Sequence, residues 1–355
     1  TRGTGSLQLR DVQWGTTPIT EAFTAQVELS EGLIRVYDAR CQIGRGMLDG
    51  ELTYRVPERR GEMALRGRRI PIDCLLAKWP KAASRTQGQF STELKGTIGE
   101  RCDIRGKLSV GRARLAGIPL SNVQAPIRWR IQPRSGKWEG TVKLQNTRIA
   151  SGTATGNWQL GWNGAFYIKG ATNVKHLDMR PLAAAVPNVN NLLSGRLSGD
   201  FSLESRNLRT PHDLNGSYRL RLEQTQTLLL PVLESLTASL GLSSPTSLTF
   251  TRTDVVGNIG RGVMKVQEMS MVGPEARMWV VGQLGFGGVI DFDVTADTGR
   301  LSGINLVAGA INPLELLRRR LVFLHLSGSI RNPIVQPRTE QFLAQELVLF
   351  FLPVI

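Results

Sequence analysis

The sequence is poor in the residue types on which most catalytic and metal sites depend. It has 3 histidines and 3 cysteines among 355 residues, and aromatic residues make up 6%. Cys41, Cys74 and Cys102 follow no CxxC or Cys/His spacing, which argues against a metal site and a disulfide framework. At most one disulfide can form, and the spacing leaves its pairing open. We therefore expect no metal and no cofactor.

Long apolar runs are also missing. The longest, LVLFFLPVI at 347–355, has nine residues, whereas a helix needs about 20 to cross a bilayer. The chain begins TRGTGSLQL, without an initiator methionine, and therefore reads as a piece of a longer protein. We expect any signal peptide or membrane anchor to lie outside it.

Positive charge exceeds negative charge by a wide margin. The sequence holds 44 Lys and Arg against 29 Asp and Glu, a formal net charge of +15, and its densest basic cluster is 318–320. Such a charge favours anionic partners in general, phospholipid headgroups and nucleic acids alike. The arginines alternate with apolar residues, and neither an aromatic-rich run nor a basic helix is present. We therefore expect no nucleic-acid partner.

The chain repeats itself with a period just over one hundred residues. Residues 70–120, which begin IPIDCLLAKWP, are similar to residues 174–233, which begin VKHLDMRPLAAAVP. The matched residues are 105, 107, 110 and 112 positions apart: Asp73 and Asp178, Gly88 and Gly195, Gly106 and Gly216, Pro119 and Pro231. A repeat of this kind is typical of elongated architectures in which each unit buries its apolar face against its neighbours. We predict units of roughly 7–127, 128–247 and 248–338 within a repetitive region 1–338.

Alternating apolar and polar residues predict strands. The pattern is clear in PIRWRI (126–131), YRLRL (218–222) and IDFDV (290–294), where one face is apolar and the other charged. Glycine-containing turns separate these strands at short intervals, which favours antiparallel meanders over crossover helices. We predict a mostly β fold: an elongated, twisted antiparallel sheet that forms a taco-like apolar groove, with a few short helices.

Helices are expected at a few points. The segments after Asp73 and Asp178 each begin at an acidic residue suited to N-capping and end at a proline. Further helices are predicted at 231–241 and 311–323, each with a proline in its first turn. The segment 339–355 reads as a C-terminal amphipathic helix, either a lid on the sheet or a foot that contacts a membrane or partner.

Sites for catalysis and nucleotide binding are weakly supported. His176 and His212 lie near aspartates. The repeat places Pro71 at about the position of His176, and Cys102 or Asp103 at about that of His212, which argues against a chemical role. GNIGRG at 257–262 departs from the GxGxxG spacing, and no GK[ST] sequence is present. We interpret its glycines as turns and bulges, and we do not expect an enzyme.

The strand pattern G-x-L-x-G-x-L, the LD-x-x-x-L helix start, the turn into LPVLESL and LHLSGSIRNPIVQP at 324–337 resemble the C-terminal region of AsmA-like proteins. This superfamily includes the TamB-like envelope proteins of diderm bacteria. The resemblance covers residues 7–340 and rests on pattern and spacing. It implies a periplasmic, non-catalytic bridge for intermembrane phospholipid transport and outer-membrane biogenesis. It also implies an inner-membrane tether outside this chain, and membrane proteins as partners at the ends.

Phospholipid acyl chains are the partner that the predicted apolar groove fits. The residues predicted to line it are Leu52, Tyr54, Phe90, Leu94, Leu108, Ile127, Trp129, Val142, Leu144, Trp158, Leu160, Phe201, Leu203, Leu220, Leu222, Phe250, Phe292 and Val294. A second interpretation makes the same residues the core of a closed β-sandwich or barrel.

The sequence is also compatible with two other functions. One is an assembly scaffold for outer-membrane proteins that pairs client strands with exposed sheet edges, which a long unpaired strand at FLHLSGSI (323–330) would favour. The other is a secreted enzyme or carbohydrate-binding protein. That function needs exposed aromatic residues on one face, and Trp158 and Trp162 are the close tryptophan pair that would serve it.

Overall fold

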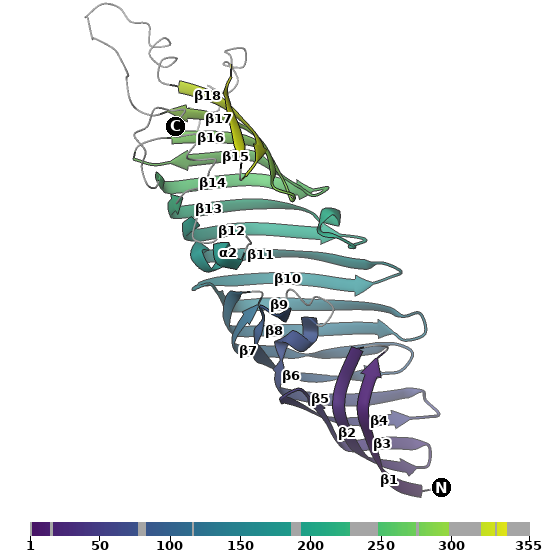
Figure 1. The fold of residues 1–355 in the computed structure, drawn as a ribbon. Coiled ribbons are helices and arrows are strands. Elements are labelled where there is room, and N and C mark those ends of the chain that lie inside the picture. Colours follow the sequence, from purple (N-terminus) through teal and green to yellow (C-terminus); the bar gives the residue numbers. More distant parts are fainter. Residues whose placement is uncertain are drawn as a thin grey trace, which may run out of the picture. The chain divides into compact units, whose positions relative to one another are not determined.

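The computed structural model describes residues 2–14, 17–76, 83–115, 117–185, 193–227, 248–274, 277–297, 321–330 and 332–338. Nineteen strands lie among these residues, and they belong to one antiparallel sheet (Figure 1). This confirms the predicted mostly β fold. The described residues divide into two compact units between Leu177 and Asp178, with Glu204–Arg209 belonging to the first. The three predicted repeat units stay a prediction.

The first unit is an antiparallel meander in which each strand pairs with the next along the chain. Its strands are β1 (Arg2–Trp14), β2 (Thr17–Ser30), β3 (Leu33–Ile43), β4 (Gly46–Arg55), β5 (Arg60–Pro71), β6 (Gln87–Ile98), β7 (Cys102–Leu115), β8 (Ile118–Gln132), β9 (Lys137–Ile149), β10 (Gly152–Trp162) and β11 (Phe166–Asp178).

The second unit continues the same design. Its strands are β12 (Leu193–Ser205), β13 (Asn215–Thr227), β14 (Leu248–Gly260), β15 (Val263–Val272), β16 (Arg277–Gly285), β17 (Val289–Asp297), β18 (Leu321–Ser329) and β19 (Pro333–Pro337). From β13 onward each pairs antiparallel with its successor. Strand β18 is paired on both sides, so the unpaired strand that would favour an assembly scaffold is not found at this position.

Short helices occur where the repeat predicts them. The 3-10 helix η1 (Ile72–Leu76) contains Asp73, and the helix α2 (Met179–Ala185) follows Asp178, whose Oδ1 accepts a hydrogen bond from the Arg180 backbone N–H at 3.0 Å. A second 3-10 turn, η2, spans Pro211–Asp213. The helices predicted at 231–241 and 339–355 lie outside the described residues. The prediction at 311–323 is wrong at its end, because Leu321 already begins β18.

The internal repeat has a structural counterpart. Gly88 on β6 has φ +125°, and its equivalent Gly195 on β12 has φ +129°. Glycine adopts such positive φ angles readily, whereas a residue with a Cβ would be strained there. Because the equivalent strands differ by six in the chain order, the repeat of about 105–110 residues corresponds to six strands.

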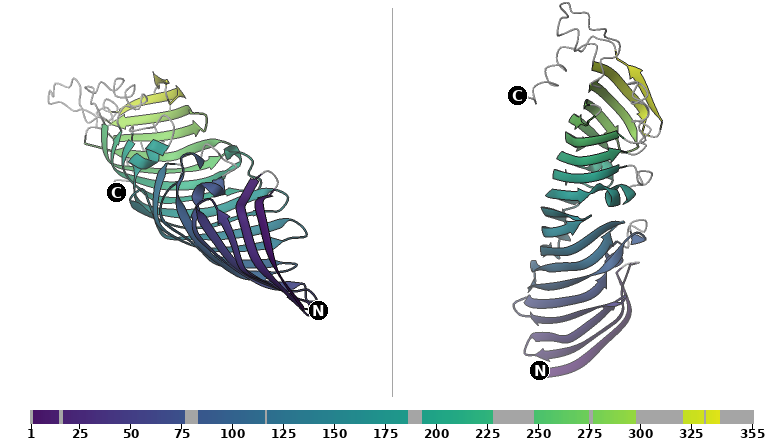
Figure 2. Two further views of the ribbon diagram at one scale, coloured as in Figure 1. Left: turned by 60° about the horizontal axis from the view of Figure 1, so that its bottom comes forward. Right: turned by 90° about the vertical axis from the view of Figure 1, so that its left-hand side faces the viewer.

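Bulges bend the strands of the first unit in one region. The pairing registers shift near Asp38, Arg69, Gly88 and Thr155, and Asp38 and Arg69 have φ near +50°. A β-bulge bends its strand and increases the local twist. Figure 2 shows the strands of this unit as bent ribbons. The shifts near Arg69, Gly88 and Thr155 lie toward the edge at which β3 connects to β4, β5 to β6, β7 to β8 and β9 to β10, here called the bulged edge, and the shift near Asp38 lies in the middle of β3.

Each unit has its own buried apolar cluster. In the first unit it lies beside the bulged edge and consists of Ile70, Ile72, Phe90, Val110, Val123 and Ala125. In the second unit it consists of Phe250, Met271, Met278, Val280, Ile290, Val294, Ala296, Leu324 and Leu326. Burial of these side chains is the main favourable contribution to the fold.

Candidate functional site

The candidate site is the apolar face of the first unit. Directly paired residues of neighbouring strands point to the same side of a sheet. One row of paired residues therefore runs along this face through eight strands, from β4 to β11: Gly50, Leu65, Leu94, Gly106, Ile127, Val142, Trp158 and Gly170. A second row lies two residues further along each strand, toward the turns that join β4 to β5, β6 to β7, β8 to β9 and β10 to β11. It consists of Leu52, Met63, Gly96, Ile104, Trp129, Gly140, Leu160 and Ile168.

The predicted lining residues of this unit all lie on that face. They are Leu52, Tyr54, Phe90, Leu94, Leu108, Ile127, Trp129, Val142, Leu144, Trp158 and Leu160. Ten of them are half-buried, and Phe90 is buried in the cluster beside the bulged edge. The described strands belong to a single sheet, so no second sheet among the described residues covers this face.

Glycines in these rows allow the large side chains to lie flat on the sheet. A Cβ at Gly140 would collide with the Trp129 ring, and one at Gly170 with the Trp158 ring. Glycine at these two positions therefore makes room for the ring of the neighbouring strand. The rings cover backbone that a glycine leaves bare, a known stabilising arrangement in sheets. The Trp158 ring is also fixed in place, because its Nε1–H donates to Thr172 Oγ1 at 3.0 Å.

The predicted residues of the second unit divide into half-buried and fully buried ones. Phe201, Leu203, Leu220, Leu222 and Phe292 are half-buried. The other two, Phe250 and Val294, are 1% and 3% exposed and belong to the buried cluster of that unit. As they stand in this structure, they contribute to the core and offer no surface to a ligand.

Several residues of the apolar face escaped the sequence prediction. Met63, Leu65 and Ile104 lie in its two rows, and Trp138 and Phe166 lie on the same face in the next row beyond them. Trp138 connects two other aromatic rings, with centroids 5.5 Å from Trp129 and 6.1 Å from Phe166. Its position two residues before Gly140 would have placed it on this face by alternation alone.

The Trp158 and Trp162 pair does not form a platform by itself. The two residues alternate along β10 on the apolar face, and Trp162 pairs with Trp138 of β9. Trp162 is 44% exposed and Trp158 is half-buried, so their surroundings differ. The aromatic residues at this end of the strands are part of the apolar face.

The opposite face is polar and is held by ion pairs. Asp103 of β7 accepts two hydrogen bonds from Arg128 of β8, at 2.9 and 2.5 Å, and lies 3.4 Å from Arg105. The second unit repeats this arrangement, because Asp254 lies between Arg221 and Arg252. Both carboxylates join adjacent strands on the polar face.

Ion pairing shifts the pKa of Asp103 to about 2, chiefly through the hydrogen bonds from Arg128. A carboxylate with a lowered pKa stabilises the folded state above its unfolded pKa, near 3.9, and loses this contribution as the pH falls toward 2. We therefore expect Asp103→Asn to lower the melting temperature at pH 5 to 7 and to have little effect near pH 2. Thermal unfolding of both proteins across this range checks the prediction, and a pH-independent difference would contradict it.

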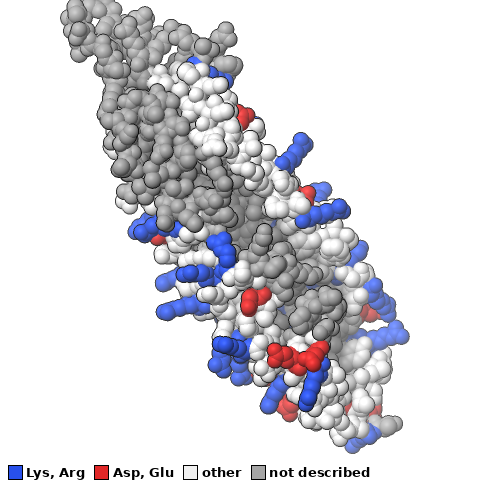
Figure 3. Space-filling view, viewed as in Figure 1, with Lys and Arg blue, Asp and Glu red and all other residues white. Residues whose placement is uncertain are grey.

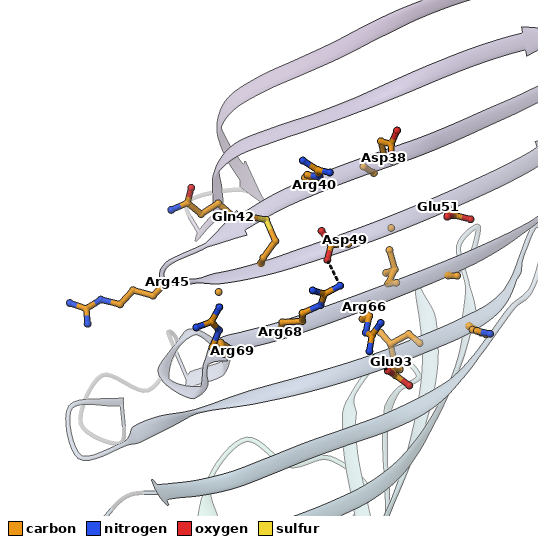
Figure 4. A pocket seen from close by; sticks show the side chains of 18 residues that line it. Asp38, Arg40, Gln42, Arg45, Asp49, Glu51, Arg66, Arg68, Arg69 and Glu93 are labelled. Carbon is orange, nitrogen blue, oxygen red and sulfur yellow. Dashed lines mark ion pairs between the residues drawn. The ribbon is translucent and has the colours of Figure 1, made fainter.

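Open hollows lie on the polar face. One of about 990 Å³ is lined mainly by polar residues from β3 to β6, together with Met47, Leu65 and Leu94 (Figure 4). Arg68 forms an ion pair with Asp49 at 3.5 Å there, and Arg66 one with Glu93 at 3.3 Å. These pairs are largely exposed and contribute little to stability. Nothing in this hollow resembles a catalytic arrangement of a nucleophile and a base.

The three histidines lie apart, on β11, η2 and β18. His176 and His212 are exposed, and the His212 ring lies 5.8 Å from that of Phe286. The third, His325, contacts Asp293 at 3.0 Å between paired strands. GNIGRG ends β14, and Arg261 and Gly262 form the turn with φ of +53° and +74°. The prediction of a turn is thus confirmed.

The described ranges contain neither a candidate metal cluster nor a helix that could span a membrane. No group of three or more His, Cys, Asp or Glu there could hold a metal ion. No described helix has the length and apolar character to cross a bilayer. The three cysteines are free, with Cys41 buried and Cys74 exposed. Compared with known proteins, the chain matches no family model, no curated protein and no solved structure.

Proposed function

We propose that the apolar face binds phospholipid acyl chains and that the protein carries lipid between membranes without catalysing a reaction. The observation that supports this is the pair of apolar rows, which run without interruption across eight strands while most of their side chains are only half-buried. An apolar sheet face must be covered by another layer or by a ligand. An acyl chain fits a long, uniform surface of this kind.

The free energy gained by burying an acyl chain favours such binding. Each buried methylene contributes ~0.8 kcal/mol, so an acyl chain of about 16 carbons gains roughly 10 kcal/mol before its loss of freedom is counted. Every row position carries an apolar side chain or a glycine, so a chain that slides exchanges one apolar contact for another. The bacterial envelope, the tether outside this chain and the membrane-protein partners implied by the AsmA-like resemblance belong to the same proposal.

The test places one charge on the apolar face. Ile127 of β8 lies in the middle of a row and outside the buried cluster, so Ile127→Glu puts a carboxylate where an acyl chain would bind. We expect at least a tenfold loss of phospholipid that copurifies with the protein, measured by native mass spectrometry and lipid extraction. Gln132→Glu changes the charge equally on the same strand, but at an exposed position on the polar face, and should retain lipid.

Folding must be separated from binding. Circular dichroism shows whether Ile127→Glu keeps the sheet, and quenching of tryptophan fluorescence by a brominated phosphatidylcholine reports acyl chains near Trp129 and Trp158 directly. Equal lipid in both variants, or none in the wild type together with no quenching, would contradict the proposal. An Ile127→Glu chain that fails to fold, beside a wild type that is not quenched, would instead identify the face as a closed core.

A further inference from the structure

A row of unpaired cations follows the bulged edge on the polar face. Paired residues place Arg112 of β7, Ser121 of β8, Arg148 of β9, Thr153 of β10 and Lys175 of β11 side by side. Arg112, Arg148 and Lys175 are exposed. Among the residues that the structure describes, no carboxylate is paired with any member of this row, here called the basic row. Every second strand thus contributes a cation, about 10 Å from the next by strand spacing.

Several other cations of the polar face have acidic partners. Arg105 and Arg128 share Asp103, and Lys169 of β11 forms an ion pair with Glu204 at 3.5 Å. Within the described ranges, Arg112, Arg148 and Lys175 have no ion pair. Strands β7 and β11 therefore carry a paired cation further along the strand, and among the described residues an unpaired one near this edge. The overall excess of basic over acidic side chains is visible in Figure 3.

A hollow beside the basic row adds further cations. Its volume is about 890 Å³, and Arg45, Arg69 and Arg112 line it together with serine, glutamine and asparagine side chains. Asp73 is its acidic residue, and the Asp73 Oδ1 accepts the backbone N–H of Cys74 at 3.1 Å. In Figure 4, Arg45 and Arg69 lie toward the strand ends, away from the labelled acidic side chains.

We propose that the bulged edge of the first unit docks on an anionic phospholipid surface through the basic row and the arginines of the adjoining hollow. Charge complementarity selects anionic groups. Five cations, one in the β3–β4 turn and one each on β5, β7, β9 and β11, fit a surface that presents many phosphates better than a single small anion. Exposed apolar side chains flank them at this edge, with Met47 39% and Leu115 38% exposed, a combination typical of contact with a lipid interface.

This docking surface goes beyond acyl-chain binding, because it lies on the opposite face of the sheet and uses charge. A single-stranded nucleic acid is the competing partner. Its bases would need aromatic side chains to stack on, and the basic row contains only Arg, Lys, Ser and Thr. The observations therefore favour the lipid surface.

The test compares two triple variants of equal charge on the same three strands. Arg112→Gln/Arg148→Gln/Lys175→Gln removes the basic row, while Arg105→Gln/Lys143→Gln/Lys169→Gln removes three cations nearer the middle of β7, β9 and β11. Binding is measured by cosedimentation with phosphatidylcholine vesicles that contain phosphatidylglycerol, and with pure phosphatidylcholine vesicles as a reference. Each cation near an anionic membrane contributes about a fivefold change in partitioning, so loss of the basic row should weaken binding roughly 100-fold.

The outcomes separate docking from net charge and from other ligands. We expect the control variant to bind within about threefold of the wild type, and added salt to weaken wild-type binding. If both variants lost vesicle binding equally, net charge alone would explain the binding and the proposal would be wrong. Equal binding of the wild type to both vesicle types would also overturn it. The proposal would also be overturned if a fluorescent oligonucleotide or inorganic phosphate bound more tightly than the vesicles and this binding depended on the basic row. The basic-row variant should still copurify with lipid, and this readout distinguishes failure of docking from failure of acyl-chain binding.

Discussion

Phe250→Ala is expected to destabilise the second unit by roughly 3–5 kcal/mol, the usual cost of emptying a fully buried phenylalanine site. Phe250 is 1% exposed and packs in the cluster that contains Met278 and Leu326, themselves 2% and 1% exposed. The lost transfer free energy and the remaining cavity add, because a well-packed core relaxes only in part.

Melting temperature is the measurement for this variant, and the loss should be on the order of 10 °C. Phe286→Ala is the matched control, because it removes the same side chain from a turn where Phe286 is 39% exposed. We expect this control to change stability by less than about 1 kcal/mol. Equal effects of the two substitutions would show that Phe250 is not a core residue. It would then again be a candidate to line an open apolar face.

The assignment of Phe250 to the core shows where sequence reasoning stops. Strict alternation placed the predicted residues of the first unit on one face, because strand side chains have a period of two and the pairing keeps that period in register. Alternation says nothing about how deeply each side chain is buried. Phe90 and Leu94 occupy equivalent positions in the same pattern, yet Phe90 is buried and Leu94 only half-buried.

Bulges account for part of this difference. Phe90 lies next to register shifts in both of its strand pairings, where the bent strands bring Ile70 and Val110 against it. The bends include left-handed backbone at Arg69, Asn122 and Asn146. Asparagine tolerates this conformation, but arginine does so rarely, and nothing in the sequence around Arg69 signals it. The position of the buried cluster was therefore beyond prediction, as was the basic row, which depends on the register of five strands.

Gly106 provides the second large expected effect, because the rows of the apolar face depend on glycines that admit the neighbouring strand. A Cβ at Gly106 would collide with the backbone carbonyl oxygen of Glu93 and would lie 2.7 Å from the Leu94 Cδ2. A side chain can move aside, but a carbonyl oxygen within a paired strand cannot move without breaking the ladder. We therefore expect Gly106→Ala to destabilise the protein by roughly 2–3 kcal/mol, as overpacking does elsewhere.

Gly111→Ala is the control on the same strand, since a Cβ at Gly111 meets nothing within 4 Å. Alanine there should be neutral or stabilising by up to about 1 kcal/mol, because it restricts the unfolded chain. Thermal unfolding of the two variants gives the comparison.

The repeat extends this prediction to Gly216, where a Cβ would collide with the Ser202 carbonyl oxygen of the preceding strand. If the spacing of glycines in both repeats serves this close approach, Gly216→Ala must show a loss similar to that of Gly106→Ala. Unchanged melting temperatures for both would mean that the strands separate at little cost, and that the glycines are not required for the apolar rows.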